Sequence, residues 1–451
     1  MKEFAIDIIK KLNKHNYTAY LAGGCVRDKL LKRVPNDYDV ATNATPQEII
    51  KLFPRTSPVG ESFGVVVVVD INDSKLQVEV ATFRSDGVYE DGRHPSDIKF
   101  VSAQEDALRR DFTINGMFFD PIENRIIDYV GGQYDLKNGI VKTIGNPIDR
   151  FNEDYLRILR AIRFSCQLEF DIENETMEAI RNNAFLVTLT SKERIREEIT
   201  KILLGSNIFH GFELLEESNI LRHILPEISN LKGIAQNPKH HPEGDVWNHI
   251  MLILQYLEVV GNTSSELAWA CLLHDIGKPE CFSIGDYKNV CAFGHDKVGE
   301  RISKEILERF KFSNDFIERV SNNISNHMNF RNVKIMKKSK LKRFFMQSHF
   351  DEMLLLHRLD CCSSNKIYDD YDFCVEKIQE FKDNNELVFE VKKPRSKYIN
   401  GNDLITMNLI QGPIYSIILN KVLDEELEGN INSKAEAVVF VTRFVEEIKE
   451  D

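Results

Sequence analysis

A change in hydrophobic spacing near residue 145 limits the folds that this chain of 451 residues can adopt. Before this point, β-branched runs such as Val65–Val69 and Leu76–Phe83 alternate with short amphipathic stretches, which predicts strands mixed with helices. After Asn152, apolar residues recur at three- and four-residue spacing along most of the chain, which predicts helices. We therefore expect an α+β protein with a small α/β head and a long helical body.

Breaks in the helical pattern divide the body further. Lys232-Gly233 and Pro238 interrupt it once, and the charged stretch KDNNE interrupts it again near residue 385. The expected domains are a catalytic head at 1–145, a helical neck and body at 146–232, a third domain at 233–385, and a C-terminal helical tail module at 386–451.

Composition narrows the class of protein. With 42% hydrophobic and 28% charged residues, the chain has the balance of a soluble protein. It contains no apolar run of about 18 residues, so we expect no membrane span. The N-terminus lacks the apolar block of a signal peptide. Eight cysteines include no C-x-x-C pair, which favours reduced thiols in a cytoplasm.

The net charge of −12 taken alone argues against a nucleic-acid partner. The position of the positive residues matters more than their sum, however. Basic residues gather at 331–343 and again at 392–397. Each stretch is either an RNA contact or a solvated face, and the sequence leaves both alternatives open. Nothing in the pattern implies a protein partner.

The head contains a motif suited to binding a triphosphate and a metal. Gly23-Gly24 lies between a predicted strand and a predicted helix, where backbone N–H groups approach phosphate oxygens, and Arg27 follows in the first turn. Asp37 and Asp39 are two residues apart in a predicted strand, so we expect both carboxylates on one face. Such a pair suits Mg²⁺-assisted nucleotidyl transfer, with Glu79 as a possible third ligand.

A second motif, EDYLRILRAIRF, predicts a helix on which Asp154 and Arg157 are neighbours. Cytosine and adenine both present an amino group beside a ring-nitrogen acceptor, so Asp154 would accept from the first and Arg157 would donate to the second. Uracil and guanine present the opposite pattern, and each unpaired group would cost about 1–3 kcal/mol. Arg160 and Arg163 follow on the same helix and could hold phosphates.

These segments resemble the bacterial class II tRNA nucleotidyltransferase and poly(A) polymerase family. Its motifs are matched in order by GGCVRD, DYDVAT, VEVATFR, RRDFTINGM and EDYLRILRAIRF. The resemblance implies a polymerase-β-like head followed by helices that clamp the tRNA acceptor stem. It also implies that Gly24, Arg27 and Arg110 contact the incoming nucleotide, that Asp37 and Asp39 hold Mg²⁺, and that the residues of EDYLRILRAIRF named above select and bind the nucleotide.

A polar segment after the hairpin resembles the flexible loop with which full CCA-adding enzymes switch from C to A. Its residues of interest are Arg84, Asp86, Gly87, Tyr89 and Arg93. The loop favours CCA or A addition over CC addition. It does not exclude a poly(A) polymerase.

The third domain resembles HD phosphohydrolases. Histidines and aspartates at the spacing of that family would converge on a divalent metal of unknown identity; they are His249, His274, Asp275 and Asp360. His295 and His327 are candidates for a second metal. The resemblance implies phosphatase or phosphodiesterase activity, with a purely structural RNA-binding tail as the alternative.

The sequence therefore predicts template-independent addition of C, C and A to tRNA in the cytoplasm, with CTP, ATP and Mg²⁺. The alternatives are a poly(A) or A-adding enzyme, and an HD metal-dependent phosphohydrolase that acts on RNA ends.

Overall fold

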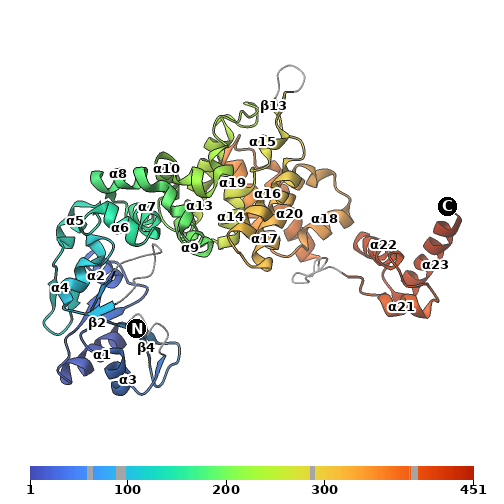
Figure 1. Ribbon diagram of the computed structural model, residues 1–451. Coiled ribbons are helices and arrows are strands. Elements are labelled where there is room, and N and C mark those ends of the chain that lie inside the picture. The colour runs from blue at the N-terminus through green and yellow to red at the C-terminus, as the bar shows by residue number, and fades with distance from the viewer. Residues whose placement is uncertain (58–63, 88–97, 285–289, 385, 387–394, 451) are drawn as a thin grey trace. The chain divides into compact units, whose positions relative to one another are not determined.

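The computed structural model describes residues 1–57, 64–87, 98–284, 290–384, 386 and 395–450 (Figure 1). Contacts divide the chain into two compact units. Residues 1–230 and 309–311 form the first unit, and residues 231–308 and 312–451 form the second. Among the described residues, no helix is long and apolar enough to cross a membrane.

The head is built on a seven-stranded sheet with the strand order β3-β4-β5-β2-β1-β8-β9. Within this sheet, β2 and β5 run parallel to each other, and every other pair of neighbouring strands is antiparallel. The strands are β1 (Ala19–Ala22), β2 (Asp39–Thr42), β3 (Thr56–Ser57), β4 (Val65–Val69), β5 (Gln77–Thr82), β8 (Phe118–Asp120) and β9 (Arg125–Ile127). The predicted hairpin is confirmed as β4 and β5, with Val67 opposite Glu79.

Short helices cover this sheet because its strands alternate buried residues on two faces. Helices α1 (Lys2–Lys14) and α3 (Pro46–Leu52) contact the strands β1, β2, β4 and β5. Helix α4 (Ala103–Leu108) contributes Ala107 to a cluster of buried hydrophobic side chains that also contains Phe83 and Phe118. The remaining head elements are α2 (Gly24–Leu30), α5 (Gly132–Asn138), and the separate strand pair β6 (Arg84–Asp86) and β7 (Ile98–Phe100).

Helices form most of the rest of the first unit, as the spacing predicts. They are α6 (Pro147–Glu153), α7 (Leu156–Leu168), α8 (Asn174–Asn183), α9 (Lys192–Leu203), α10 (Ile208–Glu217), α11 (Ile220–Ile224) and α12 (Pro226–Ser229). The short strands β10 (Ile140–Val141) and β11 (Asp171–Ile172) pair in parallel between the head and these helices. Helix α7 is buried along most of its length and contacts α9.

The second unit is also helical. Its elements are α13 (Val246–Val260), α14 (Ser265–Leu273), α15 (Lys278–Cys281), α16 (His295–Arg309), α17 (Asn314–Asn326), α18 (Lys338–Phe345), α19 (Phe350–Ser363) and α20 (Asp369–Asp383), with the strand pair β12 (Ser283–Ile284) and β13 (Val290–Cys291). Near the C-terminus, α21 (Gly401–Thr406), α22 (Ile414–Glu428) and α23 (Lys434–Glu450) enclose a core of their own that includes Leu404, Val422 and Val441.

The basic stretch 331–343 is largely paired within the protein. Lys334 binds Asp370 at 3.0 Å, and Arg343 binds Asp424 at 2.8 Å. Lys342 is 5% exposed; its Nζ lies 2.6 Å from Glu386 and donates to the carbonyl of Leu427 at 2.7 Å. The bonds of Lys342 to Leu427 and of Arg343 to Asp424 join α18 to α22. In the stretch 392–397, Lys392 and Lys393 lie outside the described residues.

Candidate functional site

A polar cleft of about 770 Å³ lies in the first unit. Arginines outnumber carboxylates on its wall. The sequence-predicted residues that line it are Gly24, Arg27, Asp37, Asp39, Arg110, Asp154, Arg157, Arg160 and Arg163. They come from α2, from the segment around β2, from the loop after α4, from the junction between α6 and α7, and from α7. The cleft therefore joins the two motifs, which are more than a hundred residues apart in sequence.

One wall of the cleft is formed by Gly23 and two arginines. Gly23 has φ +71° and ψ −132°, a conformation that only glycine adopts without strain, and a Cβ there would lie 3.4 Å from Arg110 Nη1. Arg110 is held by the buried carboxylate of Asp106 at 3.0 Å. Arg27 donates to Asn115 Oδ1 at 2.8 Å and to Asp28. Both guanidinium groups are therefore positioned before any ligand binds.

The paired aspartates occupy different backbone settings. Asp39 begins β2, whereas Asp37 precedes the strand and is exposed, so the prediction that both lie in one strand is wrong. Both nevertheless line the same cleft. Val40 pairs with Val80 in the parallel ladder, which places Glu79 beside Asp39. Burial, followed by the charges of Asp37 and Glu79, raises the pKa of Asp39 to about 6. This repulsion is the setting in which a divalent cation is favoured.

The expected continuous helix through Asp154 and Arg157 is interrupted. Asp154 has φ −145° and ψ 104°, which ends α6, and its Oδ1 accepts the N–H of Leu156 at the start of α7. A short acidic side chain caps the next helix here instead of continuing the last one. Asp154 is bound not by Arg157 but by Arg194 of α9, through two bonds of 3.0 and 2.8 Å.

Each arginine of the second motif has a fixed counter-charge. Arg157 lies 2.6 Å from Glu153 and also donates to the carbonyls of Arg150 and Arg109. Arg160 binds Asp111 Oδ2 at 2.5 Å, and this pairing outweighs burial and lowers the pKa of Asp111 to about 2. Arg163 lies 3.0 Å from Glu198, which is 2% exposed. The cleft is therefore preorganised by internal ion pairs, and the sequence motif identified only one member of most of them.

The predicted flexible loop is only partly described. Arg84 and Asp86 begin and end β6, which pairs with β7. The backbone N–H of Arg84 donates to Asp106 at 3.2 Å. Gly87 is exposed, and Tyr89 and Arg93 lie outside the described residues.

The second unit gathers four histidines around one buried aspartate. They are His249, His274, His295 and His327, with Asp275 at the centre. Three of them donate Nδ1–H to backbone carbonyls, at 3.0 Å for His274 and 2.6 Å for both His295 and His327. Because a carbonyl only accepts, the proton is fixed on Nδ1 and the Nε2 lone pair faces inward.

These inward lone pairs fit metal ions better than a hydrogen-bond network. His295 Nε2 and His327 Nε2 are 3.1 Å apart, and His249 Nε2 and His274 Nε2 are 3.2 Å apart. His295 and His327 both carry their proton on Nδ1, so their Nε2 atoms are two acceptors that repel unless a cation lies between them. Asp275 presents Oδ1 to the first pair and Oδ2 to the second, so one carboxylate could bridge two ions.

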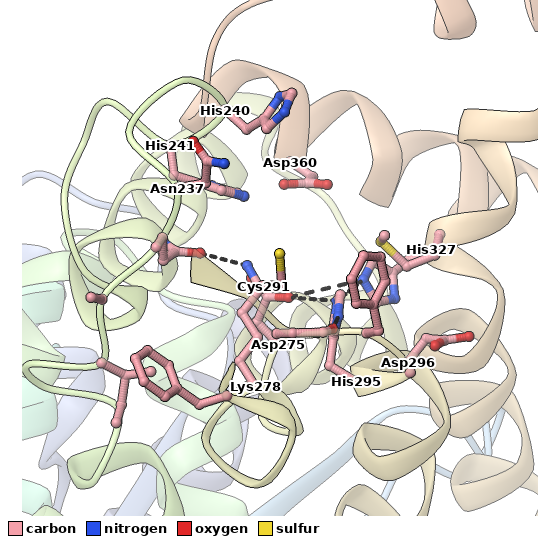
Figure 2. Close-up of a pocket in the computed structure, with 18 of the residues that line it drawn as sticks. Asn237, His240, His241, Asp275, Lys278, Cys291, His295, Asp296, His327 and Asp360 are labelled. Carbon is pink, nitrogen blue, oxygen red and sulfur yellow. Dashed lines mark hydrogen bonds and ion pairs between the residues drawn. The ribbon is translucent and has the colours of Figure 1, made fainter. Parts of the chain in front are cut away.

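Among the described residues, the potential ligand atoms fall into three groups, each within 4.8 Å. One contains His249, His274 and Asp360, another contains Asp275, His295 and His327, and the third contains His241, Glu243 and His249. Figure 2 shows Asp275, His295 and His327 directed toward one another, with Asp360 on the far side of the pocket. All six residues expected from the sequence are therefore brought together. Sequence reasoning did not single out Glu243, whose Oε1 accepts Nδ1–H of His249 at 2.7 Å and lies 2.9 Å from Nδ1 of His241.

The pKa values of two histidines in this second site shift in opposite directions. Although burial alone would lower it, the pKa of His249 is raised to about 9 by its hydrogen bonds to Asp360 and Glu243. Burial and the neighbouring His295 and His274 lower the pKa of His327 to about 3. The adjoining pocket, of about 280 Å³, is lined by Lys278, Arg331 and the exposed ring of Phe293 among others. Lys278 Nζ donates to Asp275 Oδ2 and to Gln236 Oε1, each at 2.5 Å, so Arg331 is the better candidate to bind an anionic ester.

Comparisons with protein families match three successive regions of the chain. Residues 19–142 match the family described as "Poly A polymerase head domain". Residues 169–232 match "Probable RNA and SrmB-binding site of polymerase A". Residues 246–362 match "HD domain".

Curated relatives and solved structures agree on one family. A CCA-adding enzyme of Ligilactobacillus salivarius is 32% identical over 437 residues, or 96% of this chain and 94% of the relative. A CCA-adding enzyme of Anoxybacillus flavithermus is 44% identical over 229 residues, or 51% of this chain, and the match spans only 56% of that relative. The crystal structure of the Bacillus stearothermophilus CCA-adding enzyme in complex with CTP superposes with a TM-score of 0.73 at 25% identity, covering 99% of this chain and 98% of the other.

Proposed function

This chain belongs to the CCA-adding enzyme family, and on that premise we propose that it adds C, C and A to the 3′ end of tRNA. CTP and ATP are the donors, the tRNA 3′-hydroxyl is the attacking group, and pyrophosphate leaves. The observation that carries the proposal is the single cleft that contains both motifs. The proposed division into a head at 1–145, neck and body at 146–232, HD domain at 233–385 and tail module at 386–451 follows the sequence breaks. A substrate of this kind also favours a cytoplasmic location.

In the head, Asp37 and Asp39 would hold Mg²⁺, and Glu79 stands beside Asp39 as a third candidate. A bound Mg²⁺ would favour attack by the 3′-hydroxyl and neutralise charge on the leaving group. The raised pKa of Asp39 supports this assignment, because the cation would relieve the repulsion among the carboxylates. Arg27 and Arg110 bind the triphosphate, and Gly24 lets the backbone approach it.

Base selection is assigned to Asp154 and Arg157 at the other side of the cleft. Asp154 accepts from the amino group of cytosine or adenine, and Arg157 donates to the adjacent ring nitrogen. Arg160 and Arg163 complete the nucleotide site. The loop residues Arg84, Asp86, Gly87, Tyr89 and Arg93 would couple this selection to the step from C to A.

The direct test is extension of a tRNA transcript that lacks its 3′ CCA. CTP alone should give two additions, and a third should require ATP. A long ladder with ATP alone would identify a poly(A) polymerase instead, and no extension with any mixture would refute nucleotidyl transfer. Asp154→Ala should relax the choice between CTP and UTP, and unchanged selectivity in that variant would refute the template role.

We propose a second activity for the HD domain, that of a metal-dependent phosphohydrolase acting on RNA ends. The inward Nε2 atoms of four histidines favour this candidate over a structural role. His249, His274 and Asp360 would hold one divalent ion, while His295 and His327 would hold another, with Asp275 between them. Such ions would supply a hydroxide nucleophile, and Arg331, which lines the adjoining pocket, would bind the phosphate.

Metal content and hydrolysis test this second activity separately. The purified protein should bind Mn²⁺, Ni²⁺ or Zn²⁺ in a ratio near two per chain by calorimetry. His274→Ala together with Asp275→Ala should abolish that binding while leaving CCA addition intact. Binding that survives in the double variant would refute the ligand assignment. Metal binding without hydrolysis of any RNA-end phosphate would refute the activity.

A further inference from the structure

An arginine outside both sequence motifs controls the orientation of Asp154. Arg194 of α9 places Nη1 3.0 Å from Oδ1 and Nη2 2.8 Å from Oδ2 of that carboxylate. The two side chains are 22% and 21% exposed, and both line the cleft. Paired parallel bonds between a guanidinium and a carboxylate fix the plane of each group. Asp154 is therefore held in one orientation.

The same contacts leave Asp154 with a single directed acceptor. Oδ1 accepts both the Arg194 guanidinium and the backbone N–H of Leu156 at 3.1 Å, which occupies its two lone pairs. Oδ2 accepts one bond from Arg194 and keeps one lone pair open. An amino group requires exactly this kind of partner, one acceptor in a fixed direction. A carboxylate free to rotate would offer its lone pairs in many directions.

Helix α9 supports this arrangement along one face. Arg194, Glu198 and Lys201 are spaced by four and three residues, so they lie on the same side of the helix. Glu198 holds Arg163 at 3.0 Å, and Lys201 lines the cleft with Arg194. Helix α9 contacts α7 directly. Helix α9 thus holds Asp154 through Arg194 and Arg163 through Glu198.

We propose that Arg194 is a specificity-determining positioning residue. It holds Asp154 in the orientation that accepts the amino group of cytosine or adenine. A base that lacks this amino group gains no hydrogen bond from that orientation. This inference rests on the proposed function, in which Asp154 reads the base. Loss of Arg194 releases the carboxylate, and the directed acceptor for the amino group of cytosine is lost with it. A single hydrogen bond of this kind is worth about 10- to 100-fold, and the discrimination between CTP and UTP should fall by that factor.

A merely structural Arg194 would behave differently. Its loss would lower stability, or slow addition of every nucleotide by the same factor, and the ratio between nucleotides would be unchanged. The ratio of kcat/KM for CTP to kcat/KM for UTP therefore separates the two roles. Arg194→Lys adds a second criterion, because lysine restores the charge without the two parallel bonds.

The experiment compares the full-length parent with Arg194→Met, Arg194→Lys and the control Arg196→Met. Arg196 lies on the same helix and donates to the carbonyls of Phe310 and Lys311, outside the cleft. Each protein is given tRNA lacking CCA and one nucleotide at a time in single-turnover assays. The thermal midpoint and the tRNA Kd are measured in parallel.

We expect Arg194→Met to lower the CTP/UTP ratio about 10- to 100-fold and to leave the tRNA Kd within a few-fold. Arg194→Lys should recover part of that ratio, and Arg196→Met should keep all of it. A parental ratio in both Arg194 variants overturns the inference, and Arg194→Lys decides the matter if Arg194→Met does not fold. A parent that adds no CTP overturns the proposed function itself and the inference with it.

Discussion

Asp39→Asn should stabilise the free protein while it abolishes nucleotidyl transfer. The pKa of Asp39 is raised from 3.8 to about 6 by burial and by the charges of Asp37 and Glu79. A shift of about two pH units corresponds to about 3 kcal/mol, since each unit is about 1.4 kcal/mol. The neutral amide removes this penalty but also removes the metal ligand. For a unit of this size, 1 kcal/mol shifts Tm by about 2–4 °C, so the gain corresponds to a rise of about 6–12 °C.

The way in which the Tm difference changes with pH shows whether the Asp39 carboxylate causes it. Below pH 4, Asp39 is protonated in the folded and the unfolded chain, so the parent carries no penalty there. Between pH 4 and pH 6, the unfolded chain loses this proton first, and the parent loses stability as the pH rises. The difference in Tm between Asp39→Asn and the parent should therefore be small near pH 4 and fully developed above pH 6.

Calorimetry on the full chain at pH 4.5 and pH 7.5, with and without Mg²⁺, provides the assay. Mg²⁺ should raise the Tm of the parent and leave that of Asp39→Asn unchanged. The matched control is Asp7→Asn, which removes an exposed carboxylate paired with Lys10 and should shift Tm by less than about 2 °C. If Asp39→Asn melts at or below the parental Tm at pH 7.5, the repulsion argument is wrong.

Three further substitutions test other parts of the structure. Asp37→Ala should abolish extension of tRNA but leave tRNA binding within a few-fold in a filter-binding assay. Normal extension by this variant would show that Asp37 is not a ligand of the catalytic metal. Glu243→Gln should weaken the first divalent ion about 10–100-fold in calorimetry, because His249 loses its orienting carboxylate; an unchanged Kd would contradict this. Lys342→Met should cost about 1–3 kcal/mol in urea unfolding, because Glu386 and the Leu427 carbonyl lose a buried partner.

Local patterns predicted most of the elements that bear the head motif, although Asp37 lies before β2 rather than in it. The hairpin formed by β4 and β5 and the helix after Gly23-Gly24 follow from residue type and spacing within about ten positions. The division into an α/β head and a helical body likewise follows from the change of hydrophobic period. The break at Asp154 was missed, because capping by a single carboxylate competes with helical spacing that is otherwise unbroken.

The candidate sites show the same boundary between local and distant information. Sequence spacing identified the six histidine and aspartate residues of the HD domain, but their tautomers depend on carbonyls such as those of Ala292 and Ile324. The charge partners of the nucleotide cleft are also distant, as Arg194 lies 40 residues beyond Asp154 and Asp111 lies 49 residues before Arg160. The spacing of Arg194, Glu198 and Lys201 along α9 is visible in the sequence, yet any solvated amphipathic helix has the same pattern.

The sequence by itself identified the candidates for each kind of chemistry: carboxylates for a metal, arginines for phosphates, an Asp and Arg pair for a base, and a second set of metal ligands. Those assignments depend on residue type and short spacing, which are properties of the chain before it folds. Only the tertiary structure decided how each group is oriented. Arg194 turns Asp154, Asp106 holds Arg110, and Glu243 fixes His249, because a bidentate ion pair or a buried hydrogen bond exists only where folding brings distant segments within about 3 Å.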